Sequence, residues 1–496
     1  MQQITKLVLS IIPLFFLVAC YDYFSKGKKA DNHASFIHLD YSLEKAVKEE
    51  NVVPAVVVGS GPAGLSAALY LARAGMKAFV FAGSMPLGQL TQTTYVENWP
   101  GRDKVMGPEL MDDMKKQAQS FGAVLIHDIV TNVDFTSWPF KITTEEGREF
   151  KALSVILATG ATPKKLNIDG EQEYWGKGVT TCAVCDARFF KGKDVVVVGG
   201  GDSAVEMVFE LSPYVKSVTV LVRKGSMRAA AAGQKKIENY SNASVEYHKE
   251  VTKIYGDGEQ VVAIDVYDNE KKVTEKRAID GVFLAVGHDP NNKILSEGIA
   301  LDKHGYLIMK ERTQETSVPG VFAAGEIQDA YYRQAIVAAG EGAKAALDVT
   351  SFLYEIGFNS EIGAELDKNF FEHFSDVKKE LQEITTTQEL EDLVINAKGV
   401  VVLDFYSLDC PCCIQMLPHL EAVAHKLDGK VKILKTNYTL VKKTIYRDLA
   451  LTYDIRVAKL PSLLVFKDGK IQEINTKVMN KKQLYTYLSQ FLDENK

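Results

Sequence analysis

The sequence lacks the patterns that define several large classes of protein. Six cysteines in 496 residues are too few for a disulfide scaffold in a chain of this length. The nine histidines show neither an HExxH motif nor another ligand spacing, so we expect no catalytic metal. Basic residues number 58 against 64 acidic ones and form no stripe, which argues against a nucleic-acid surface. With 46% hydrophobic and 25% charged residues, the composition is that of a soluble globular protein, and the length predicts about three domains.

A long hydrophobic run is also missing. The apolar segment at residues 7–19 is shorter than the roughly 20 residues of a membrane-spanning helix and fits the core of a signal peptide. It is followed by Cys20, where a bacterial lipoprotein would be cleaved and lipidated. The lysines of segment 26–29 favour retention on the cytoplasmic side. We expect a protein on the cytoplasmic side, anchored to the membrane through residues 7–20, with export as a lipoprotein as the alternative.

Five of the six cysteines gather in two Cys-x-x-Cys motifs. Cys182 and Cys185 stand in TTCAVCDARFF, and Cys410 and Cys413 stand in VVLDFYSLDCPCC at the end of an apolar run. A single zinc site made from both pairs is disfavoured, because they lie much farther apart than the roughly 20 residues typical of a zinc ribbon. The sequence therefore predicts two separate dithiols.

A glycine loop follows the first apolar run after residue 50. Residues 52–58 (VVPAVVV) predict a strand, and GSGPAGLSAALYLARAGM predicts a loop and a helix directly after it. In this GxGxxG pattern Gly59 allows the tight turn, Gly61 lets the backbone approach a pyrophosphate, and Gly64 lets helix and strand pack closely. At the end of the next strand stands Ala82, where an acid often holds a ribose, so ribose recognition must come from elsewhere.

A second loop of the same kind, GGGDSA, follows the apolar run DVVVV. About twenty residues later stand basic side chains. An acid at this position would favour a cofactor with a free ribose hydroxyl, whereas basic groups favour the 2′-phosphate of NADPH. The alternative is a solvated basic edge. Two strand–loop–helix units predict an internally duplicated α/β protein. The predicted NADPH site consists of Gly199, Gly201, Asp202, Ser203, Ala204, Arg223, Lys224 and Arg228.

Asp186 directly follows the first dithiol. A dithiol that takes reducing equivalents from a flavin needs two thiols able to close a disulfide, and an acid or base nearby to move the accompanying proton. A structural or metal-binding turn is the alternative for an isolated motif of this kind. The two nucleotide loops in the same chain favour the redox interpretation.

Residues 51 to about 353 resemble the bacterial-type, low-molecular-weight thioredoxin reductases over essentially the whole length of that family. The matching blocks are GSGPAGLSAALYLARA, GQLTQTTYVENWPG, MGPELMDDM, VILATGATPKKL, CAVCD, VVGGGDSAVE, AVGHDPN and PGVFAAGEIQDAYYRQAIVAAGEG. The resemblance implies an FAD-binding domain from residues 51–165 and 290–353, with an NADPH-binding domain, residues 166–289, that carries the first dithiol. The FAD contacts that it implies are Gly59, Ser60, Gly61, Ala63, Gly64, Ala82, Gly83, Gly88, Gln89, Asn98, Gly325, Glu326, Arg333, Gln334 and Ala335.

The same resemblance implies roles for the first dithiol. Cys185 faces the flavin, Cys182 attacks the outgoing disulfide, and Asp186 manages protons. The family usually has Asp at the position of Glu326, so one added methylene must be accommodated beside the cofactor. The family is usually homodimeric, and its NADPH domain rotates between flavin reduction and thiol delivery.

The C-terminal residues, about 381–496, resemble thioredoxin. Asp404 matches its buried acid, Cys410 and Cys413 its active dithiol, with Cys410 the expected nucleophile and Cys413 the resolving thiol. Pro418 matches the kink of the active-site helix, and Leu460–Pro461 matches the cis-proline loop, followed by the turn KDGK.

The surroundings of this second dithiol depart from the thioredoxin pattern. Asp409 replaces the usual Trp, and Pro411–Cys412 replaces the usual Gly-Pro. A carboxylate beside Cys410 would oppose the thiolate that a helix N-terminus favours. Cys412 adds a third thiol, which is either a bystander or an alternative exchange partner.

Together these observations predict an α/β chain with two Rossmann-like nucleotide domains of the pyridine nucleotide-disulfide oxidoreductase type and a C-terminal thioredoxin fold. We expect residues 1–20 to be a signal or anchor segment, 21–50 a tether and 354–380 a linker. The expected function is a thioredoxin-disulfide reductase in which electrons pass from NADPH through FAD and Cys182–Cys185 to the fused thioredoxin and on to protein disulfides. The alternatives are a flavin-dependent dithiol oxidase, a reductase dedicated to a peroxidase partner, and a C-terminal module that acts only as a docking adaptor.

Overall fold

The structure is a computed structural model that describes residues 39–93, 95–370, 381–407, 410–427, 429–457 and 459–492. The expected anchor segment at residues 7–20 lies outside these ranges. Within the described ranges, none of the helices combines the length and the apolar character needed to cross a membrane.

The first nucleotide domain is built on a seven-stranded sheet. Strands β1, β2, β5, β8 and β19 run parallel, and β7 and β6 continue from β8 in antiparallel pairs. Every residue of the central strand β1 is buried, as expected of an apolar run covered on both faces. The strands are β1 (Val52–Val58), β2 (Ala78–Phe81), β5 (Val124–Ile126), β6 (Val130–Asp134), β7 (Phe140–Thr144), β8 (Glu149–Leu157) and β19 (Val321–Ala323).

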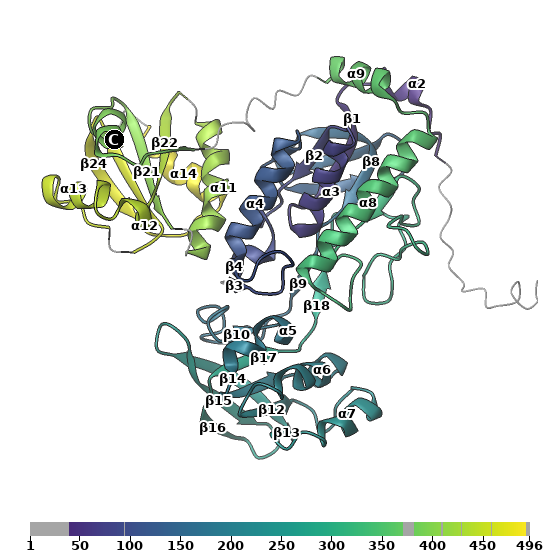
Figure 1. Ribbon diagram of the computed structural model, residues 1–496, viewed down its shortest axis with the longest axis vertical. Helices are drawn as coiled ribbons and strands as arrows, with labels where there is room; N and C mark the ends of the chain where they lie inside the picture. The colour runs from purple at the N-terminus through teal and green to yellow at the C-terminus, as the bar shows by residue number, and fades with distance from the viewer. Residues whose placement is uncertain are drawn as a thin grey trace, which may run out of the picture. The chain divides into compact units, whose positions relative to one another are not determined.

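Two helices lie side by side on one face of this sheet, α3 (Pro62–Arg73) and α8 (Ala335–Glu355) (Figure 1). They pack closely because small residues meet between them: a Cβ on Gly342 would lie 2.0 Å from the carbonyl oxygen of Ala63. Next to α3 lies α4 (Gly107–Ser120), which is preceded by η1 (Gln89–Gln92), β3 (Tyr95–Val96) and β4 (Val105–Met106).

Two segments predicted to be a tether and a linker belong instead to this domain. Residues 39–50 include α2 (Leu43–Ala46), and residues 358–369 include α9 (Ser360–Lys368). Ala46 and Leu366 are 0% and 2% exposed and belong to the same hydrophobic core as β1. Asn369 holds the two segments together, because its Nδ2 donates to the carbonyl of Val47 at 2.6 Å. The prediction was wrong here because these segments are mostly polar, with few apolar residues that become buried.

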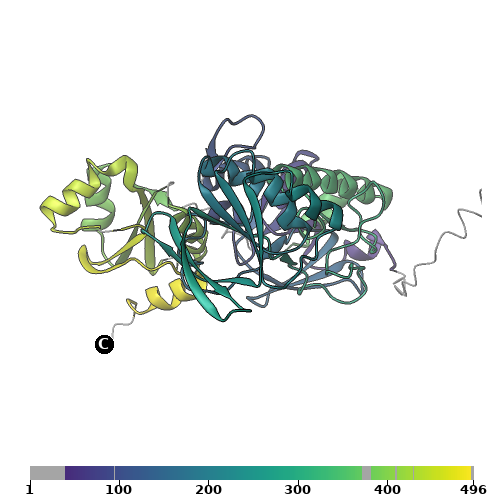
Figure 2. The ribbon, with the colours of Figure 1, turned by 90° about the horizontal axis from the view of Figure 1, so that it is seen from below.

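The second nucleotide domain has a five-stranded parallel sheet in the order β10–β17–β11–β12–β13, and a separate antiparallel sheet of three strands, the teal ribbons of Figures 1 and 2. The chain crosses from one nucleotide domain to the other at β9 (Ala161–Pro163) and β18 (His288–Pro290), which pair with each other. The large sheet contains β10 (Val179–Thr180), β11 (Asp194–Val198), β12 (Ser217–Val222), β13 (Ala243–Tyr247) and β17 (Gly281–Leu284); the small one contains β14 (Lys249–Gly256), β15 (Val261–Asp268) and β16 (Val273–Ala278). The helices of this second nucleotide domain are α5 (Ala183–Asp186), η2 (Ala187–Phe190), α6 (Asp202–Leu211) and α7 (Ala231–Ile237).

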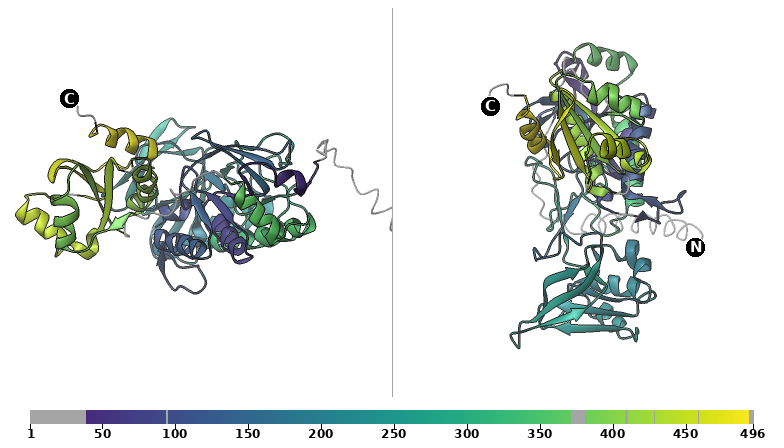
Figure 3. Two further views of the ribbon diagram at one scale, coloured as in Figure 1. Left: turned by 90° about the horizontal axis from the view of Figure 1, so that it is seen from above. Right: turned by 90° about the vertical axis from the view of Figure 1, so that its left-hand side faces the viewer.

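The C-terminal module is a five-stranded mixed sheet in the order β20–β22–β21–β23–β24, with helices on both faces (Figure 3). Helices α11 and α14 cover one face, and α10, α12 and α13 cover the other. Strands β21 and β23 form an antiparallel pair within this sheet. The elements are β20 (Gln382–Glu383), α10 (Thr387–Leu390), η4 (Glu391–Ile395), β21 (Val400–Tyr406), α11 (Pro411–Lys426), β22 (Val431–Asn437), α12 (Tyr438–Val441), α13 (Ile445–Thr452), β23 (Ser462–Lys467), β24 (Lys470–Asn475) and α14 (Lys481–Ser489).

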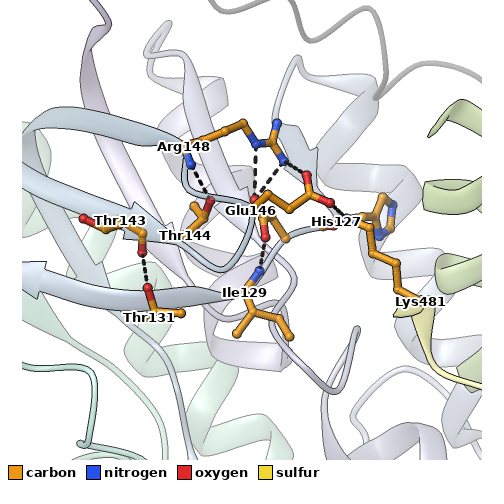
Figure 4. A network of polar contacts seen from close by, with 9 residues as sticks. His127, Ile129, Thr131, Thr143, Thr144, Glu146, Arg148 and Lys481 are labelled. Atoms are coloured by element: carbon orange, nitrogen blue, oxygen red, sulfur yellow. Dashed lines mark hydrogen bonds and ion pairs between the residues drawn. The ribbon is translucent and has the colours of Figure 1, made fainter. Parts of the chain in front are cut away.

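A polar network fastens the turn between β7 and β8 (Figure 4). The guanidinium of Arg148 donates to the buried carboxylate of Asp128 at 2.9 Å and to Glu146 at 3.2 Å. Glu146 also forms an ion pair with Lys481, whose Nζ donates to the carbonyl of His127 at 3.0 Å. Because Asp128 is buried, its pairing with Arg148 compensates a charge that would otherwise be costly in that position.

Candidate redox site

The residues predicted to bind FAD come together from segments far apart in the chain. Ser60, in the first glycine loop, is 2% exposed; its Oγ donates to the carbonyl of Ala82 at 3.1 Å and accepts from the backbone N of Leu87 at 2.8 Å. The backbones of Gly61 and Gly88 approach each other, since a Cβ on Gly88 would lie 2.9 Å from the Cα of Gly61. The loop at 82–88 is therefore fixed against the start of α3, as a site made from both loops requires.

A second group of predicted residues forms the other part of this site. Gln89 Nε2 donates to Glu326 Oε2 at 3.1 Å, and Asn98 Nδ2 donates to Gln334 Oε1 at 3.1 Å. Burial raises the pKa of the Glu326 carboxyl. The added methylene of Glu326, relative to the family's usual Asp, is thus accommodated by a hydrogen bond to another predicted site residue. The remaining predicted positions are set into the same region: Gly83 N donates to Asp128 O at 3.2 Å, Gly325 packs against Ala63, and Ala335 opens α8.

The strand–loop packing at Gly59 leaves a polar group that suits a ligand. Gly59 has φ +115°, and a Cβ on it would lie 2.2 Å from the carbonyl of Ala158, so only glycine fits there. The neighbouring Thr159 Oγ1 is buried and has no hydrogen-bond partner among the described residues. Such a group is normally satisfied, and a polar atom of a bound dinucleotide would satisfy it. The cradle therefore fits FAD, and Thr159 is a further candidate contact that the sequence interpretation missed, although it stands in the block VILATGATPKKL.

His288 was also missed. Its Nδ1 lies 3.0 Å from Arg333 Nη1, next to the predicted flavin contacts. Burial, together with the charge of Arg333, lowers the pKa of His288 to about 4, so the imidazole is neutral and can accept from the guanidinium. The block AVGHDPN contained the signal, but without the fold nothing connects it to Arg333.

The predicted NADPH residues also converge. The backbone N of Arg228 donates to the carbonyl of Gly200 at 2.6 Å, and Asp202 Oδ1 accepts from the N of Ala230 at 2.8 Å. The exposed basic residues Arg223, Lys224 and Arg228 are thereby held beside the second glycine loop and the start of α6, where Ser203 and Ala204 lie. A Cβ on Gly201 would meet nothing within 4 Å. This open space beside a helix N-terminus fits the close approach of a pyrophosphate.

Cys182 and Cys185 form a disulfide at the start of α5. Cys182 is the N-cap residue, and its Sγ accepts from the backbone N of Cys185 at 3.2 Å. Asp186, the predicted proton-handling acid, accepts from the hydroxyl of Thr180, and burial raises the pKa of its carboxyl. Gln334 Nε2 lies 4.0 Å from the Sγ of Cys182. The dithiol and the predicted flavin contacts are therefore neighbours.

A second acid near this dithiol was not predicted. Glu210, on α6, accepts a hydrogen bond from the backbone of Val184, between the two cysteines. Burial and the charge of Glu206 raise the pKa of Glu210 to about 7. The signal in the sequence was the pair Glu206 and Glu210, which stand four residues apart on the predicted helix. Two like charges at this spacing destabilise a helix. The site thus holds two carboxyl groups, Asp186 and Glu210, whose raised pKa values let them stay protonated at a higher pH than ordinary carboxyls.

The second dithiol has the same local design. Cys410 and Cys413 form a disulfide at the N-terminus of α11, and Cys410 Sγ accepts from the backbone N of Cys413 at 3.3 Å. Cys410 is partly exposed, whereas Cys413 is 0% exposed and packs against Tyr406. The expected assignment of Cys410 as the attacking thiol agrees with this difference, because a nucleophile must be accessible.

Asp404 is buried, as predicted. It is 0% exposed on β21, and its two carboxylate oxygens make no hydrogen bond to the described residues. Burial raises the pKa of Asp404 to about 8. Leu460–Pro461 is a cis peptide bond, which confirms the predicted loop, whereas Asp409 lies outside the described residues.

One group of described residues has ligand atoms close enough together for a metal ion: the sulfurs of Cys410, Cys412 and Cys413 lie within 4.8 Å of one another. Two of these sulfurs are joined in the disulfide and are not thiolates in this state. The expectation that the protein has no catalytic metal stays a prediction.

Two dinucleotide-type folds, with a disulfide next to the predicted flavin contact Gln334, define a disulfide oxidoreductase. Comparison with known families agrees. The family described as "Pyridine nucleotide-disulphide oxidoreductase" matches residues 53–342, and the thioredoxin family matches residues 382–490. The chain belongs to the pyridine nucleotide-disulfide oxidoreductase family and carries a fused thioredoxin domain.

Three known proteins are matched over most or all of their own length. The bifunctional thioredoxin reductase/thioredoxin of Mycobacterium leprae is 34% identical over 433 residues, covering 85% of this chain and 93% of that protein. NADPH-dependent thioredoxin reductase 3 of Arabidopsis thaliana is 34% identical over 464 residues, covering 90% of this chain and 84% of that protein. Among solved structures, thioredoxin reductase from Giardia duodenalis is 41% identical and superposes with a TM-score of 0.59, covering 62% of this chain and all of that one.

Proposed function

We propose that the chain is an NADPH-dependent thioredoxin-disulfide reductase that delivers electrons to its own thioredoxin domain and from there to protein disulfides. The observation that carries the proposal is that one chain holds two helix-capping disulfides, one beside the predicted flavin contacts and one in a thioredoxin fold. A relative named for both activities matches 85% of the chain.

We assign FAD to the cradle of Ser60, Gly61, Gly88 and Thr159, and NADPH to Gly201 and the basic loop around Arg228. When bound, the flavin, reduced by NADPH, supplies the electron pair that opens the Cys182–Cys185 disulfide. The chain's own residues do the rest. The N-terminus of α5 favours a thiolate, and Asp186 and Glu210 hold and release the protons of the dithiol.

The internal transfer combines the family resemblance, which assigns Cys182 as the attacking thiol, with the exposure of Cys410. The Cys182 thiolate attacks Cys410 Sγ, which is accessible, and Cys413 leaves as a thiol; Cys185 next attacks Cys182 and releases Cys410. The result is a Cys182–Cys185 disulfide and a Cys410/Cys413 dithiol, with electrons and protons balanced. Cys410 then attacks the substrate disulfide, and Cys413 resolves the mixed disulfide.

The test compares the intact chain with Cys410→Ser/Cys413→Ser, both loaded with FAD. NADPH-driven reduction of insulin disulfides is expected from the intact chain, and a loss of at least about 100-fold from the variant. Flavin bleaching by NADPH under anaerobic conditions should be equal in both. A flavin that NADPH does not bleach would point to a dithiol oxidase, and equal insulin reduction by both proteins would point to a docking adaptor.

A reductase dedicated to a peroxidase partner stays the alternative. Homodimerisation, rotation of the NADPH domain during turnover and a tether through residues 7–20 on the cytoplasmic side complete the proposal. They are supported by the family resemblance and by the sequence pattern of the N-terminus.

A further inference from the structure

The structure places a third sulfur against the second dithiol. Cys412 Sγ lies 3.2 Å from Cys410 Sγ, within the range of about 3–3.5 Å at which reacting atoms stand before a bond forms. All three sulfurs lie within 4.8 Å of one another. Cys412 is the one cysteine among the described residues that is not in a disulfide.

The placement follows from the local backbone. Cys410 precedes α11, and Cys412 and Cys413 both stand in its first turn, so both side chains reach back toward Cys410. The two differ in exposure: Cys413 is fully buried against Tyr406, whereas Cys412 is partly exposed. A mixed disulfide formed on Cys410 is therefore flanked by one buried thiol and one accessible thiol.

We propose that Cys412 is a second resolving thiol of the thioredoxin domain, able to release substrate from Cys410 in place of Cys413. The inference rests on the function proposed above and adds a catalytic residue to it. Cys412 attacks Cys410 Sγ in the mixed disulfide: the Cys412–Cys410 bond forms, the bond from Cys410 to the substrate breaks, and the Cys412 proton goes to the departing substrate thiol. The substrate gains two electrons, and the domain ends as a Cys410–Cys412 disulfide.

This second disulfide returns to the first without any external reductant. Cys413 attacks Cys410 Sγ, the Cys410–Cys413 bond forms, and Cys412 leaves with the proton of Cys413. No net oxidation accompanies the exchange, so both disulfides are accessible to Cys182 in the next cycle.

The environment of Cys412 suits an intermittent role. While Cys410–Cys413 is closed, burial raises the pKa of the Cys412 thiol, which keeps it protonated and a weak nucleophile. Cys182 opens this disulfide, and the mixed disulfide that Cys410 then forms with the substrate presents an electrophilic sulfur to Cys412.

The experiment uses the full chain loaded with FAD and insulin as the protein disulfide. Cys413→Ser is compared with Cys412→Ser/Cys413→Ser, which differs from it by one sulfur. Cys413→Ser is expected to keep at least about a tenth of the intact turnover, while the double variant falls at least about 100-fold and accumulates an insulin adduct on Cys410. Equal turnover and equal adduct in the two variants would overturn the inference.

Two further measurements secure the result. Cys413→Ala repeats the comparison with an apolar side chain, in case Ser is poorly tolerated at a fully buried position. In the intact chain, thiols are alkylated during turnover and the peptides are mapped: a Cys410–Cys412 disulfide with alkylated Cys413 is expected, and its absence contradicts the inference. If the intact chain does not reduce insulin with NADPH, the result contradicts the proposed function. If the intact chain does reduce insulin but the two variants behave alike, the result contradicts this inference alone.

Discussion

Single residues set the chemistry of both dithiols in the same way. In each, the first cysteine lies at a helix N-terminus, and its Sγ accepts the backbone N–H of the second, Cys185 onto Cys182 and Cys413 onto Cys410. An N–H donor and a helix N-terminus both stabilise a thiolate on the accepting sulfur. Backbone groups thus favour the thiolate on both attacking thiols, Cys182 and Cys410. At the first dithiol the acids Asp186 and Glu210 also lie nearby.

The role of Cys182 gives a prediction at this scale. Cys182→Ser is expected to lower insulin reduction at least about 100-fold, because the thiol that attacks Cys410 is gone. Bleaching of bound FAD by NADPH should persist, since that step needs neither cysteine. The two readouts are absorbance of the flavin and turbidity of reduced insulin. Loss of both together would show that the cysteine supports the fold or the cofactor and not the transfer.

The buried Asp404 predicts a pH dependence of stability. Its pKa is raised to about 8 in the folded state, against about 3.9 in an unfolded chain, so folding favours the protonated form. The stability contributed by protonated Asp404 is present in full below about pH 4 and is lost as pH rises to about 8. By pH 7 the loss is about 4 kcal/mol. Asp404→Asn should flatten this dependence and stabilise the C-terminal module at pH 8 by a few kcal/mol. Hydrogen exchange of β21 amides, corrected for intrinsic rates, measures it at pH 5 and pH 8, and parallel curves for the two proteins would contradict it.

At the scale of elements, the two glycine loops combine packing with open space. Gly199 has φ +151°, and a Cβ on it would lie 2.4 Å from the carbonyl of Ala285, whereas a Cβ on Gly201 meets nothing. The same loop therefore contains one glycine that packing requires and one beside open space that a ligand can occupy.

These two glycines make a matched pair of variants. Gly201→Ala should change the free energy of unfolding by no more than about 0.5 kcal/mol, yet raise the KM for NADPH at least about tenfold, because the methyl occupies the space of the pyrophosphate. Gly199→Ala should destabilise the domain by more than about 1 kcal/mol through strain and overlap. Thermal unfolding and steady-state kinetics distinguish the two, and an unchanged KM in Gly201→Ala would remove the assigned NADPH site.

Helix α9 illustrates how an element can be mistaken for a linker. Leu366 is 2% exposed in the core next to β1, so Leu366→Ala should lower the stability of the FAD domain by about 2–4 kcal/mol. Glu365→Ala, on the exposed side of the same helix, is the control and should have an effect below about 0.5 kcal/mol. Equal, small effects in thermal unfolding would mean that α9 does not belong to the domain in solution.

For the whole molecule, the position of α9 shortens the connection between the reductase and thioredoxin domains. The segment from the end of α9 to the start of β20 is residues 369–381. Even as a random coil, such a segment has a root-mean-square reach of only about 20 Å. A connection this short keeps the effective concentration of the tethered domain high, provided that its geometry permits contact.

Dilution tests the internal relay. The rate of insulin reduction per intact chain should stay constant over about a 100-fold dilution, because the transfer from Cys182 to Cys410 takes place within one chain or one dimer. A mixture of separately assembled dimers of Cys182→Ser and of Cys410→Ser/Cys413→Ser must transfer between dimers and should lose its rate in proportion to dilution. A parallel fall for intact protein would mean that the thioredoxin domain is served by other molecules.

Much of the site could be predicted from the sequence because its chemistry depends on local patterns. Three such patterns are recognisable from residue spacing along the chain. They are a glycine loop between a strand and a helix, a CxxC motif followed by Asp186, and a thioredoxin pattern around Cys410. The residues Thr159, His288 and Glu210 could not be found that way, because each acts through contacts with parts of the chain distant in sequence: Ala158–Gly59 packing, Arg333 and Val184.

The sequence by itself determined the two nucleotide folds, the thioredoxin fold and the identity of both dithiols, since apolar runs, glycines and cysteines act through neighbours along the chain. Only the tertiary structure decided that residues 39–50 and 358–369 belong to the FAD domain, since a few apolar side chains gain a core only once β1 and its helices assemble. It also decided which buried acids have raised pKa values and that Cys412 lies beside Cys410, because burial and sulfur–sulfur distance are properties of packing and not of spacing.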